Sequence, residues 1–467
     1  MKHWNEECAV VGVYNVKNAA LKSYYALFAM QHRGQEASGI SSSDGREIYT
    51  HKGSGLVTKV FDQKSLEKLT GEASIGHNRY STAGKESLDD AQPLFARYNI
   101  GSLSIVHNGN LTNTEPIRAK LIESGAIFQS HLDTENLIHL IAQNKKPTLQ
   151  ERIIDSLKVI DGAYALVIMS RTKMFAIRDP YGLRPLCLGK IANEDGSFGY
   201  IVASESCAFD LIGAEYIREI NAGEMLVFEG MHEKQITPPK SIQVFEPRTS
   251  PCVFEFVYFA RPDSKIFGKN VYEIRKNMGK ELAKEHKIKA DIVIPVPDSG
   301  VAAALGYAKE SGIDFELGII RNHYVGRTFI EPSQKERELK VRLKLNPISD
   351  LIKDKEIIVI DDSVVRGTTS KQIIKILKTA GAKKVHLLIS SPQTISPCYY
   401  GVDTPSTDEL ICANHSLEEV RDFIGADTLG FLSLQGLARS VGKCEHGFCQ
   451  ACFDKNYVDD YTKSQSK

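Results

Sequence analysis

The sequence predicts an α+β domain followed by an α/β domain with a parallel sheet. The first half reads as many short alternating strands, such as 103–106 and 165–169, with few helices between them. The pattern breaks around Pro238-Pro239 and Pro247, and from about Asp291 strands alternate with helices. We therefore expect a leader at 1–7, a first domain at 8–235 and a second at 236–467, whose core spans about 265–405.

Length and charge exclude some classes of protein. At 467 residues the chain is too long for one core and suggests about two or three domains. Basic and acidic residues number 58 each, which argues against binding to nucleic acid or a membrane surface by bulk charge. The N-terminus lacks the apolar core of a signal peptide, and no apolar run is long enough to cross a bilayer. We expect a cytoplasmic protein whose nine cysteines are free, catalytic or metal-bound.

Apolar periodicity places the main elements. Two helices stand out in the first domain: one covers 21–31, apolar at Tyr24, Tyr25, Leu27 and Phe28, and one starts near Asp133 and runs through Leu137, Ile138 and Ile141. In the second domain strands are predicted at 253–258, 291–294, 317–320, 357–360 and 385–389. An alanine-rich helix follows the loop at 295–300.

The most informative stretch is the acid pair Asp361-Asp362 with the turn 363–370 that follows it. Carboxylates that follow a strand buried on both faces emerge at the edge of the sheet where α/β proteins bind ligands. Gly367 lets the backbone come close, and the hydroxyls of 368–370 with the N–H groups of the following helix suit a phosphate. The acids fit sugar hydroxyls or a divalent cation. The alternative is an ordinary helix cap, but the combination favours a phosphorylated sugar.

This segment resembles the signature by which phosphoribosyltransferases bind phosphoribosyl pyrophosphate (PRPP). The resemblance implies that the acids hold the ribose hydroxyls while the turn cradles the 5-phosphate. The PRPP-binding residues that it implies are Asp361, Asp362, Ser363, Arg366, Gly367, Thr368 and Thr369.

Two further segments fit the same ligand. The turn 298–300 joins a strand to a helix and is a second phosphate-loop candidate, although such turns are often simple caps. The resemblance adds Ser299 as a magnesium contact together with Asp361 and Asp362. The charge-dense segment 321–344 is usually read as a solvated loop; here we interpret it as a lid over PRPP, with Arg327 and Lys344 as ligand contacts.

Cys8 is the nucleophile candidate of the first domain. A small buried core thiol is the ordinary alternative. If residues 1–7 were removed, Cys8 would carry an α-amine with a pKa of about 7.7 to 8.0 beside a thiol near 8.5, so it could supply its own base.

Four downstream residues suit a glutamine substrate. Arg79 can hold its carboxylate and Asp133 its α-ammonium, whereas Asn108 and the Gly109 N–H can stabilise the tetrahedral oxyanion. Each has an alternative: Asn108-Gly109 is also a hairpin signal, Arg79 a possible surface cation and Asp133 a possible helix cap.

Jointly, Cys8 and the segments 31–36, 77–80, 107–110 and 133–135 resemble class II glutamine amidotransferases. That family belongs to the N-terminal nucleophile hydrolases, which implies four layers: helix, sheet, sheet, helix (αββα). Ala9 stands where the family often has glycine.

The C-terminal pair Cys449 and Cys452 has two possible partners, Cys252 and Cys398. Four thiolates from three segments could hold a 4Fe-4S cluster or a zinc ion, and a solitary CxxC could be a redox pair. The contexts 259–264 and 400–403 resemble the iron-sulfur branch of glutamine PRPP amidotransferases, which also carries a propeptide ahead of its nucleophile, and this favours 4Fe-4S. Four cysteines are left as structural thiols: Cys187, Cys207, Cys412 and Cys444.

From Glu6 to Phe453 the chain resembles the amidophosphoribosyltransferases. The resemblance implies that glutamine, PRPP and water give 5-phosphoribosylamine, glutamate and pyrophosphate, the first step of de novo purine synthesis. It also implies one Mg²⁺ and one 4Fe-4S cluster per subunit, inhibition by purine nucleotides and a homotetramer. The alternatives are a PRPP-sensing binding protein without catalysis and a different class II amidotransferase, for which the acid-pair motif has no role.

Overall fold

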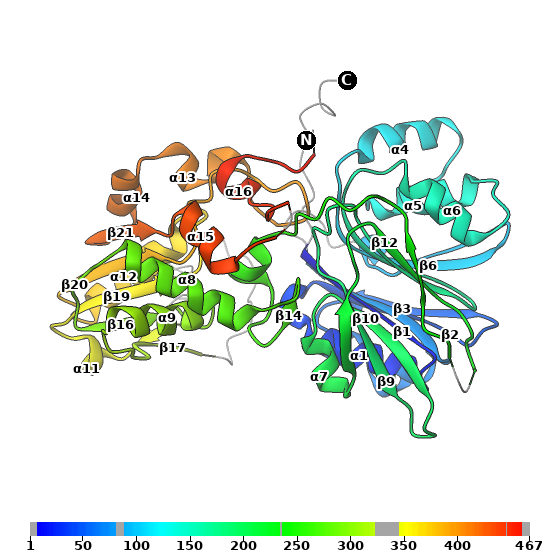
Figure 1. Ribbon diagram of the computed structural model, residues 1–467, viewed down its shortest axis with the longest axis horizontal. Helices are drawn as coiled ribbons and strands as arrows, with labels where there is room; N and C mark the ends of the chain where they lie inside the picture. The colour runs from blue at the N-terminus through cyan, green and yellow to red at the C-terminus, as the bar shows by residue number, and fades with distance from the viewer. Residues whose placement is uncertain (1–6, 81–87, 234–235, 323–344, 445, 460–467) are drawn as a thin grey trace.

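The computed structural model describes residues 7–80, 88–233, 236–322, 345–444 and 446–459 (Figure 1). The first half of the chain and the second half form two lobes that lie side by side. No helix within the described residues is both long and apolar enough to span a membrane.

The first lobe contains a seven-stranded antiparallel sheet. In chain order its strands are β1 (Glu7–Tyr14), β2 (Ala37–Ser43), β3 (Ile48–Ser54), β4 (Ala73–Tyr80), β9 (Cys187–Ala192), β10 (Phe198–Ala203) and β11 (Glu215–Glu219). The spatial order is β11-β9-β10-β1-β4-β2-β3, so β1 lies at the centre of the sheet between β10 and β4. The strand that carries the candidate nucleophile as its second residue is therefore paired along both edges.

A six-stranded sheet faces the first one. Its strands are β5 (Leu94–Tyr98), β6 (Gly101–Leu111), β7 (Gly162–Ser170), β8 (Met174–Arg178), β12 (Glu224–Phe228) and β13 (Lys240–Gln243), in the order β13-β12-β8-β7-β6-β5. Because β13 pairs with β12, this sheet extends past residue 235 to Gln243. We therefore propose a boundary between the domains after Gln243 instead of at 235.

Helices cover the outer face of each sheet. α1 (Ala19–Ala29) and α7 (Cys207–Ile212) share an apolar core with the first sheet. α4 (Thr114–Glu123), α5 (Thr134–Gln143) and α6 (Leu149–Leu157) pack on the second. A third core, which includes Val10 and Val167, fills the space between the two sheets. The four-layer αββα arrangement is confirmed.

The helix predictions were partly right. The helix expected at 21–31 is α1, and η1 (Gln31–Arg33) follows it, but Tyr25 and Phe28 are 43% and 50% exposed. The small residues Ala19, Ala20, Ser23 and Ala26 face the sheet with Leu27 instead. The helix expected near Asp133 is α5, and its apolar residues are buried as expected. The helices α4, α6 and α7 were not predicted.

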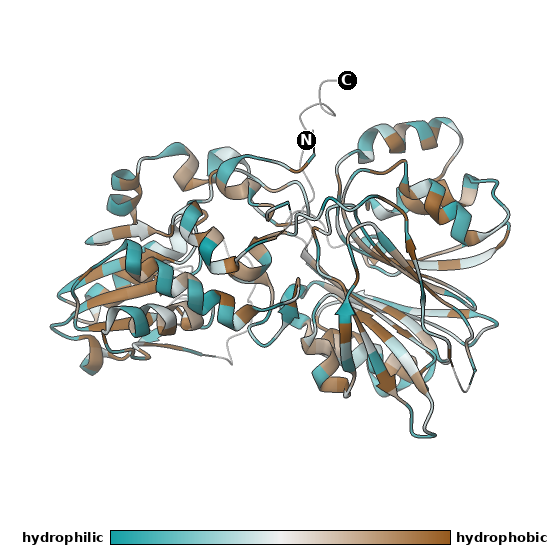
Figure 2. Ribbon diagram, in the orientation of Figure 1, coloured by the Kyte–Doolittle hydropathy of each residue, from teal (hydrophilic) through white to brown (hydrophobic). Residues whose placement is uncertain are grey.

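The core of the second lobe is a four-stranded parallel sheet. Its strands are β16 (Ile292–Pro295), β19 (Glu356–Asp361), β20 (Lys384–Ile389) and β21 (Thr428–Phe431), in that spatial order. One face is covered by α8 (Val271–Glu285), α9 (Val301–Ser311) and α15 (Leu434–Val441), and the other by α12 (Thr368–Thr379) and α14 (Leu417–Ile424). The central strands are mostly hydrophobic, whereas hydrophilic residues recur along the helices that cover them (Figure 2).

One predicted strand of this lobe lies outside the parallel sheet, and another is not a strand. The segment predicted at 317–320 forms β17 (Ile319–Arg321), which pairs antiparallel with β18 (Leu345–Pro347) outside the parallel sheet. Ile320 is 47% exposed, so no second layer covers this strand. The segment predicted at 253–258 is a short π-helix, η3 (Glu255–Phe259), because its apolar residues are buried on several sides instead of alternating.

The remaining elements are short. They are α2 (Val57–Val60), α3 (Gln63–Glu67), η2 (Leu88–Asp90), β14 (Lys265–Ile266), β15 (Lys269–Asn270), α11 (Ser349–Ile352), η4 (Thr407–Glu409), α13 (Ile411–Asn414) and α16 (Ala451–Asp454). The hairpin β14-β15 lies beside the first lobe: Ser206 accepts a hydrogen bond from the Lys265 N–H at 2.7 Å.

Candidate functional site

Cys8 lies at the start of β1 and is fully buried. Its register partner on β4 is Arg79, so the candidate nucleophile and the candidate carboxylate-binding residue lie on neighbouring strands. The Cys8 carbonyl oxygen accepts a hydrogen bond from Nε of Arg33 at 2.9 Å. The main chain of this residue is thus fixed by a buried cation as well as by the pairing of β1 with β4.

Asn108 and Gly109 belong to β6, in the sheet that faces β1. The hairpin alternative is wrong, because both residues pair with β7 inside a long strand. The Asn108 side chain is buried, and within the described residues its Nδ2 has no hydrogen-bond acceptor. Gly109 has φ 145°, and a Cβ there would lie 2.1 Å from the Ala163 carbonyl oxygen. The amide donor of Asn108 therefore lies next to a position that only glycine can occupy.

Arg79 is not a surface cation: it is only 6% exposed, and its Nη1 donates to the Asp90 carbonyl at 2.8 Å. The other alternative, that Asp133 caps α5, is also wrong, because its side chain makes no cap hydrogen bond. Asp133 accepts from the Leu111 N–H at 2.8 Å and contacts Nδ1 of His107 at 3.3 Å. Burial alone raises the pKa of Asp133, but His107 and these hydrogen bonds favour the carboxylate more, so its pKa is lowered.

The acid pair lies at the carboxyl end of β19, in a pocket of about 400 Å³. Burial and the Asp362 carboxylate raise the pKa of Asp361 well above its usual range. Asp361 accepts from the Asp362 N–H at 2.9 Å, and the Ser363 hydroxyl donates to Asp362 at 2.5 Å. The two carboxyl groups are thus held side by side at the mouth of one pocket, which is the geometry that a cation or a diol requires.

The hydroxyl-rich turn lines the same pocket. The residues of the turn that line it are Ser363, Val364, Val365, Arg366, Gly367, Thr368, Thr369 and Ser370. Gly367 has φ 70° and precedes α12, so the pocket opens onto the N-terminus of that helix. Arg366 is half exposed and forms an ion pair with Glu409 at 2.8 Å. Arg327 and Lys344, the two expected lid contacts, lie outside the described residues.

Ser299 reaches this pocket from the loop between β16 and α9. A Cβ on Gly300 would lie 2.3 Å from the Ile360 carbonyl oxygen, so glycine is what allows this loop to pack against β19. The structure therefore brings Ser299, Asp361 and Asp362 together around one space, as expected for a shared cation.

The pocket also contains residues that the sequence did not single out. It extends to Tyr80, the last residue of β4, and to Phe254, Tyr258 and Phe259 around η3. Tyr80 directly follows Arg79, so the acid-pair pocket reaches the edge of the candidate site around Cys8. The only sequence signal was that Tyr80 is part of the segment 77–80.

Four cysteines line one small cavity. They are Cys252, Cys398, Cys449 and Cys452, and the cavity also includes Leu183, Tyr400 and Tyr457. Cys252 and Cys449 lie on segments that pair in parallel, and the Val253 N–H donates to the Cys449 carbonyl at 3.0 Å. Burial raises the pKa of the Cys252 thiol to about 12. A bound metal would have to offset that cost, because ligating sulfur is the thiolate.

The shared cavity is the relation among these four thiols that bears on metal binding. Within the described part of the chain no three His, Cys, Asp or Glu side chains are grouped as ligands of a single metal ion. The sulfurs around one tetrahedral zinc would stand about 3.8 Å apart, from Zn–S bonds of about 2.3 Å. In a four-iron cluster each thiolate binds its own iron, so the sulfurs stand farther apart.

The other cysteines lie elsewhere. Cys187 contacts Glu219 at 3.4 Å, and Cys444 contacts the Thr249 carbonyl at 3.8 Å. Cys207 is buried behind α1 and Cys412 in the core around α14. The described residues contain no disulfide.

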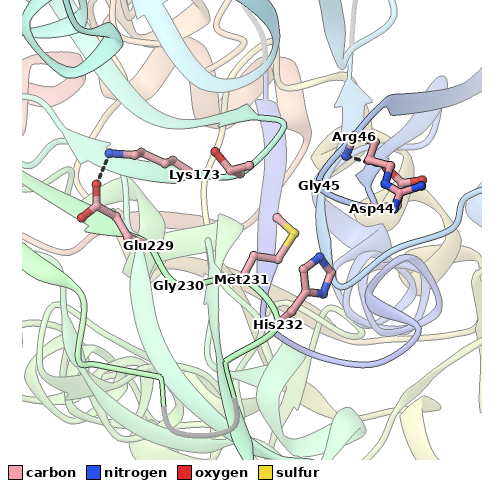
Figure 3. Close-up of a pocket in the computed structure, with 9 residues that line it drawn as sticks. Asp44, Gly45, Arg46, Lys173, Glu229, Gly230, Met231 and His232 are labelled. Atoms are coloured by element: carbon pink, nitrogen blue, oxygen red, sulfur yellow. Dashed lines mark hydrogen bonds and ion pairs between the residues drawn. The ribbon is translucent and has the colours of Figure 1, made fainter.

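Pocket size alone does not identify the site. A larger pocket of about 680 Å³ lies between the turn at 44–46 and the segment 229–232 of the first lobe (Figure 3). Lys173 and Glu229 pair across its rim, and the residues that line it include none of the candidate catalytic or binding residues. This hollow is wide open, whereas the acid-pair pocket collects the groups that could perform chemistry.

Comparison with known proteins gives a consistent result. Residues 77–210 match a family model described as a glutamine amidotransferase domain, and residues 268–408 match one described as a phosphoribosyl transferase domain. Amidophosphoribosyltransferase 1, chloroplastic, of Arabidopsis thaliana is 49% identical over 97% of this chain and 78% of its own length. Amidophosphoribosyltransferase of Bacillus subtilis is 47% identical over 98% of this chain and 95% of its own.

The fold agrees with this. A solved glutamine PRPP amidotransferase from B. subtilis, complexed with ADP and GMP, superposes with a TM-score of 0.90 at 46% identity. The match covers 97% of this chain and 98% of that one.

Proposed function

The chain belongs to the amidophosphoribosyltransferases, and from this membership we propose how its residues divide the reaction between two sites. The enzyme transfers the amide nitrogen of glutamine to PRPP, giving 5-phosphoribosylamine, glutamate and pyrophosphate, the first step of de novo purine synthesis. The observation that carries the division is the acid-pair pocket, which belongs to the second half but reaches Tyr80 of the first.

In the first site Cys8 is the nucleophile. Once residues 1–7 are removed, its α-amine accepts the thiol proton, and the thiolate attacks the amide carbon of glutamine. The side-chain amide of Asn108 and the N–H of Gly109 stabilise the oxyanion of the tetrahedral intermediate. The unpartnered Nδ2 of Asn108 supports this role, because a buried donor without an acceptor is costly unless a ligand supplies one.

Arg79 and Asp133 hold the glutamine backbone. Arg79 binds the α-carboxylate and Asp133 the α-ammonium group, so the substrate is gripped at the end that does not react. The lowered pKa of Asp133 supports this role, since the carboxylate stays ionised at neutral pH. Collapse of the intermediate releases ammonia, and water then hydrolyses the thioester to give glutamate.

In the second site the turn around Gly367 binds the 5-phosphate. Asp361 and Asp362 bind the ribose hydroxyls, and the hydroxyls and N–H groups of Ser363, Thr368 and Thr369 surround the phosphate. Arg366 must leave Glu409 to contact PRPP, and Arg327 and Lys344 complete the set from the lid. Exclusion of water from the bound sugar would leave ammonia as the nucleophile that reaches C1.

One Mg²⁺ fits between Ser299, Asp361 and Asp362. These oxygen donors share a pocket. Burial and, after it, the Asp362 carboxylate raise the pKa of Asp361, and a divalent cation there would favour the ionised form of both carboxyls. The ion would neutralise charge on the departing pyrophosphate.

One 4Fe-4S cluster fits the cavity lined by Cys252, Cys398, Cys449 and Cys452. Such a cluster would crosslink the start of η3 to the C-terminal segment. Purine nucleotides are the expected feedback inhibitors, a homotetramer the expected assembly and the cytoplasm the expected compartment.

The test is pyrophosphate release from PRPP with two nitrogen donors. We expect Cys8→Ala to abolish release with glutamine and to keep release with ammonium salts, because the second site does not contain the thiol. Asp361→Asn should abolish release with both donors. Loss of both activities in Cys8→Ala would refute the division, and glutamine hydrolysis without any consumption of PRPP would refute the second site.

A further inference from the structure

A network of buried charges joins the strand of Cys8 to the second half of the chain. Arg33 donates through Nε to the Cys8 carbonyl, through Nη1 to Glu205 and Glu255, and through Nη2 to Glu255 again, each at 2.8 to 2.9 Å. Glu205 belongs to the first half, whereas Glu255 is the first residue of η3. The guanidinium therefore bridges the two halves at the candidate nucleophile.

A second arginine holds the other side of Glu255. Nη1 of Arg184 lies 3.2 Å from Oε1 of Glu255, and its Nε and Nη2 donate to the Tyr400 carbonyl at 2.9 and 2.7 Å. Tyr400 lines the four-cysteine cavity. The network thus runs from the Cys8 main chain to the proposed cluster site.

These four charges are almost completely removed from water. Glu205 and Glu255 are 0% exposed, Arg184 1% and Arg33 3%. Two cations and two anions balance, and burial, which alone raises the pKa of Glu255, is outweighed by Arg33 and Arg184. Such networks are weak stabilisers compared with apolar packing but fix one arrangement of their parts. The network is therefore better suited to positioning the segments that it connects than to adding stability.

The element that carries Glu255 is also fixed at its other end. Arg275 of α8 donates to the carbonyls of Phe256, Tyr258 and Ala260 at 2.8 Å. Tyr258 and Phe259 line the acid-pair pocket. A short π-helix, a form often found at functional sites, is thus held between the two halves.

We propose that Glu255 is a positioning residue for the glutamine reaction: through Arg33 it fixes the main chain of Cys8. The first site is then complete only when the second half is docked against it. The inference rests on the proposed role of Cys8 as the glutamine nucleophile. Glu255 touches neither substrate, and Arg33 transmits its effect.

The test is Glu255→Gln in the full-length enzyme, with Glu281→Gln as the matched control. Glutamine has the size of glutamate, but its side-chain NH2 group would face an N–H of Arg33. One of the two hydrogen bonds from Arg33 to residue 255 is then lost. Glu281 pairs with Arg439 at the protein surface, and its replacement should change none of the activities. All rates are expressed per Cys8 N-terminus, counted by intact mass.

We expect Glu255→Gln to lower kcat with glutamine by about tenfold or more, with KM for glutamine within about twofold. Alkylation of Cys8 by a chloroketone analogue of glutamine should slow by a similar factor, because it needs the thiol in its reactive position. Alkylation by iodoacetamide and pyrophosphate release with ammonia should stay within about twofold. If all four rates fall together, or none does, the proposal is overturned.

A double variant separates positioning from folding. Glu255→Gln leaves an excess buried cation, whereas Glu255→Gln with Arg184→Gln restores the balance of charge. We expect the double variant to regain thermal stability while its glutamine rate stays low. Recovery of the glutamine rate along with stability would mean that Glu255 only supports the fold. Failure of the function proposed above would be seen separately, as glutamine use that survives in Cys8→Ala.

Discussion

The imidazole of His77 is buried in an environment that favours its neutral form. It is fully buried on β4, its Nε2 lies 3.0 Å from the His107 carbonyl oxygen, and its Nδ1 has no hydrogen-bond partner within the described residues. Burial lowers the pKa of His77 to about 3. In the unfolded chain the pKa of this imidazole is near 6.5. Between about pH 6.5 and pH 3 the unfolded state therefore binds a proton that the folded state does not bind.

The pH dependence of stability follows from that difference. As the pH falls from about 6.5 towards 3, protonation of the unfolded state removes stability, and at pH 5 this one group costs about 2 kcal/mol relative to pH 8. We expect His77→Gln, which keeps a donor for His107 but does not titrate, to lose less stability between pH 8 and pH 5. Urea unfolding at both pH values measures this.

A second replacement without an ionisable group, His77→Asn, is the control and should show the same reduced loss of stability. If parent and His77→Gln lose equal stability on acidification, the imidazole is not excluded from protonation in the fold.

Cys8 leads to a prediction about maturation. While Glu7 is attached, the nitrogen of Cys8 is an amide and cannot accept the thiol proton. We expect the active enzyme to begin at Cys8, and the glutamine-dependent rate to rise in proportion to the processed fraction. Intact mass and N-terminal sequencing measure that fraction, and the ammonia-dependent rate, which needs no thiol, is the internal control. Glutamine activity in a preparation with residues 1–7 wholly intact would overturn it.

At the scale of single residues the sequence suggested roles for side chains but not their surroundings. Residue types and order were enough to single out Asn108, Arg79 and Asp133, because a given substrate demands given donors and acceptors. Their burial, and the contact of Asp133 with β6, depend on which strands pair and were not visible in the sequence. Arg33 was noted only as part of a motif, and its partner Glu255 lies 222 residues away.

At the scale of elements, the helix pair α8 and α9 packs backbone against backbone. A Cβ on Gly279 would lie 1.8 Å from the Ala303 carbonyl oxygen, and one on Gly306 would lie 2.0 Å from that of Lys276. Alanine is the better helix former by about 1 kcal/mol. Here the close contact between the two helices leaves no room for an alanine Cβ at either position.

We expect Gly279→Ala and Gly306→Ala each to destabilise the protein, because overpacking costs typically about 1–3 kcal/mol and outweighs the gain in helix propensity. Urea unfolding measures the change, and Lys309→Ala on the exposed side of α9 is the control, which should be neutral or stabilising. A stabilised Gly279→Ala variant would show that the helices separate easily.

Elements were predictable where local sequence alone determines them. The strand, acid pair, turn and helix from 357 to 377 were correct because buried apolar residues and turn chemistry agree over one short stretch. η3 was misread because its apolar and aromatic residues look like a strand, whereas Arg275 and Arg33 hold it as a helix. α4 was missed because it buries only Ile117 and Leu121, whereas α6 begins with a capping box, Thr148 with Glu151, that was overlooked.

At the scale of the whole molecule, assembly brings together segments that are distant in the chain. The four cysteines come from the segment before η3, from the loop after β20 and from the C-terminal segment. Spacing could not choose between zinc and a cluster. The structure places the four thiols around one cavity, and the buried Arg184 favours the thiolate form of Cys252, which either metal group requires.

The cluster gives the last prediction. Protein purified without oxygen should be brown and contain about four iron atoms and four sulfides per chain. Cys452→Ser should lower iron and sulfide sharply and reduce thermal stability, because the crosslink between η3 and the C-terminal segment is lost. Cys444→Ser is the matched control: Cys444 is close in sequence but outside the cavity, so iron, sulfide and colour should persist. Stoichiometric zinc in the parent, or an equal loss of iron in both variants, would contradict the assignment, since only thiols that line the cavity can bind the cluster.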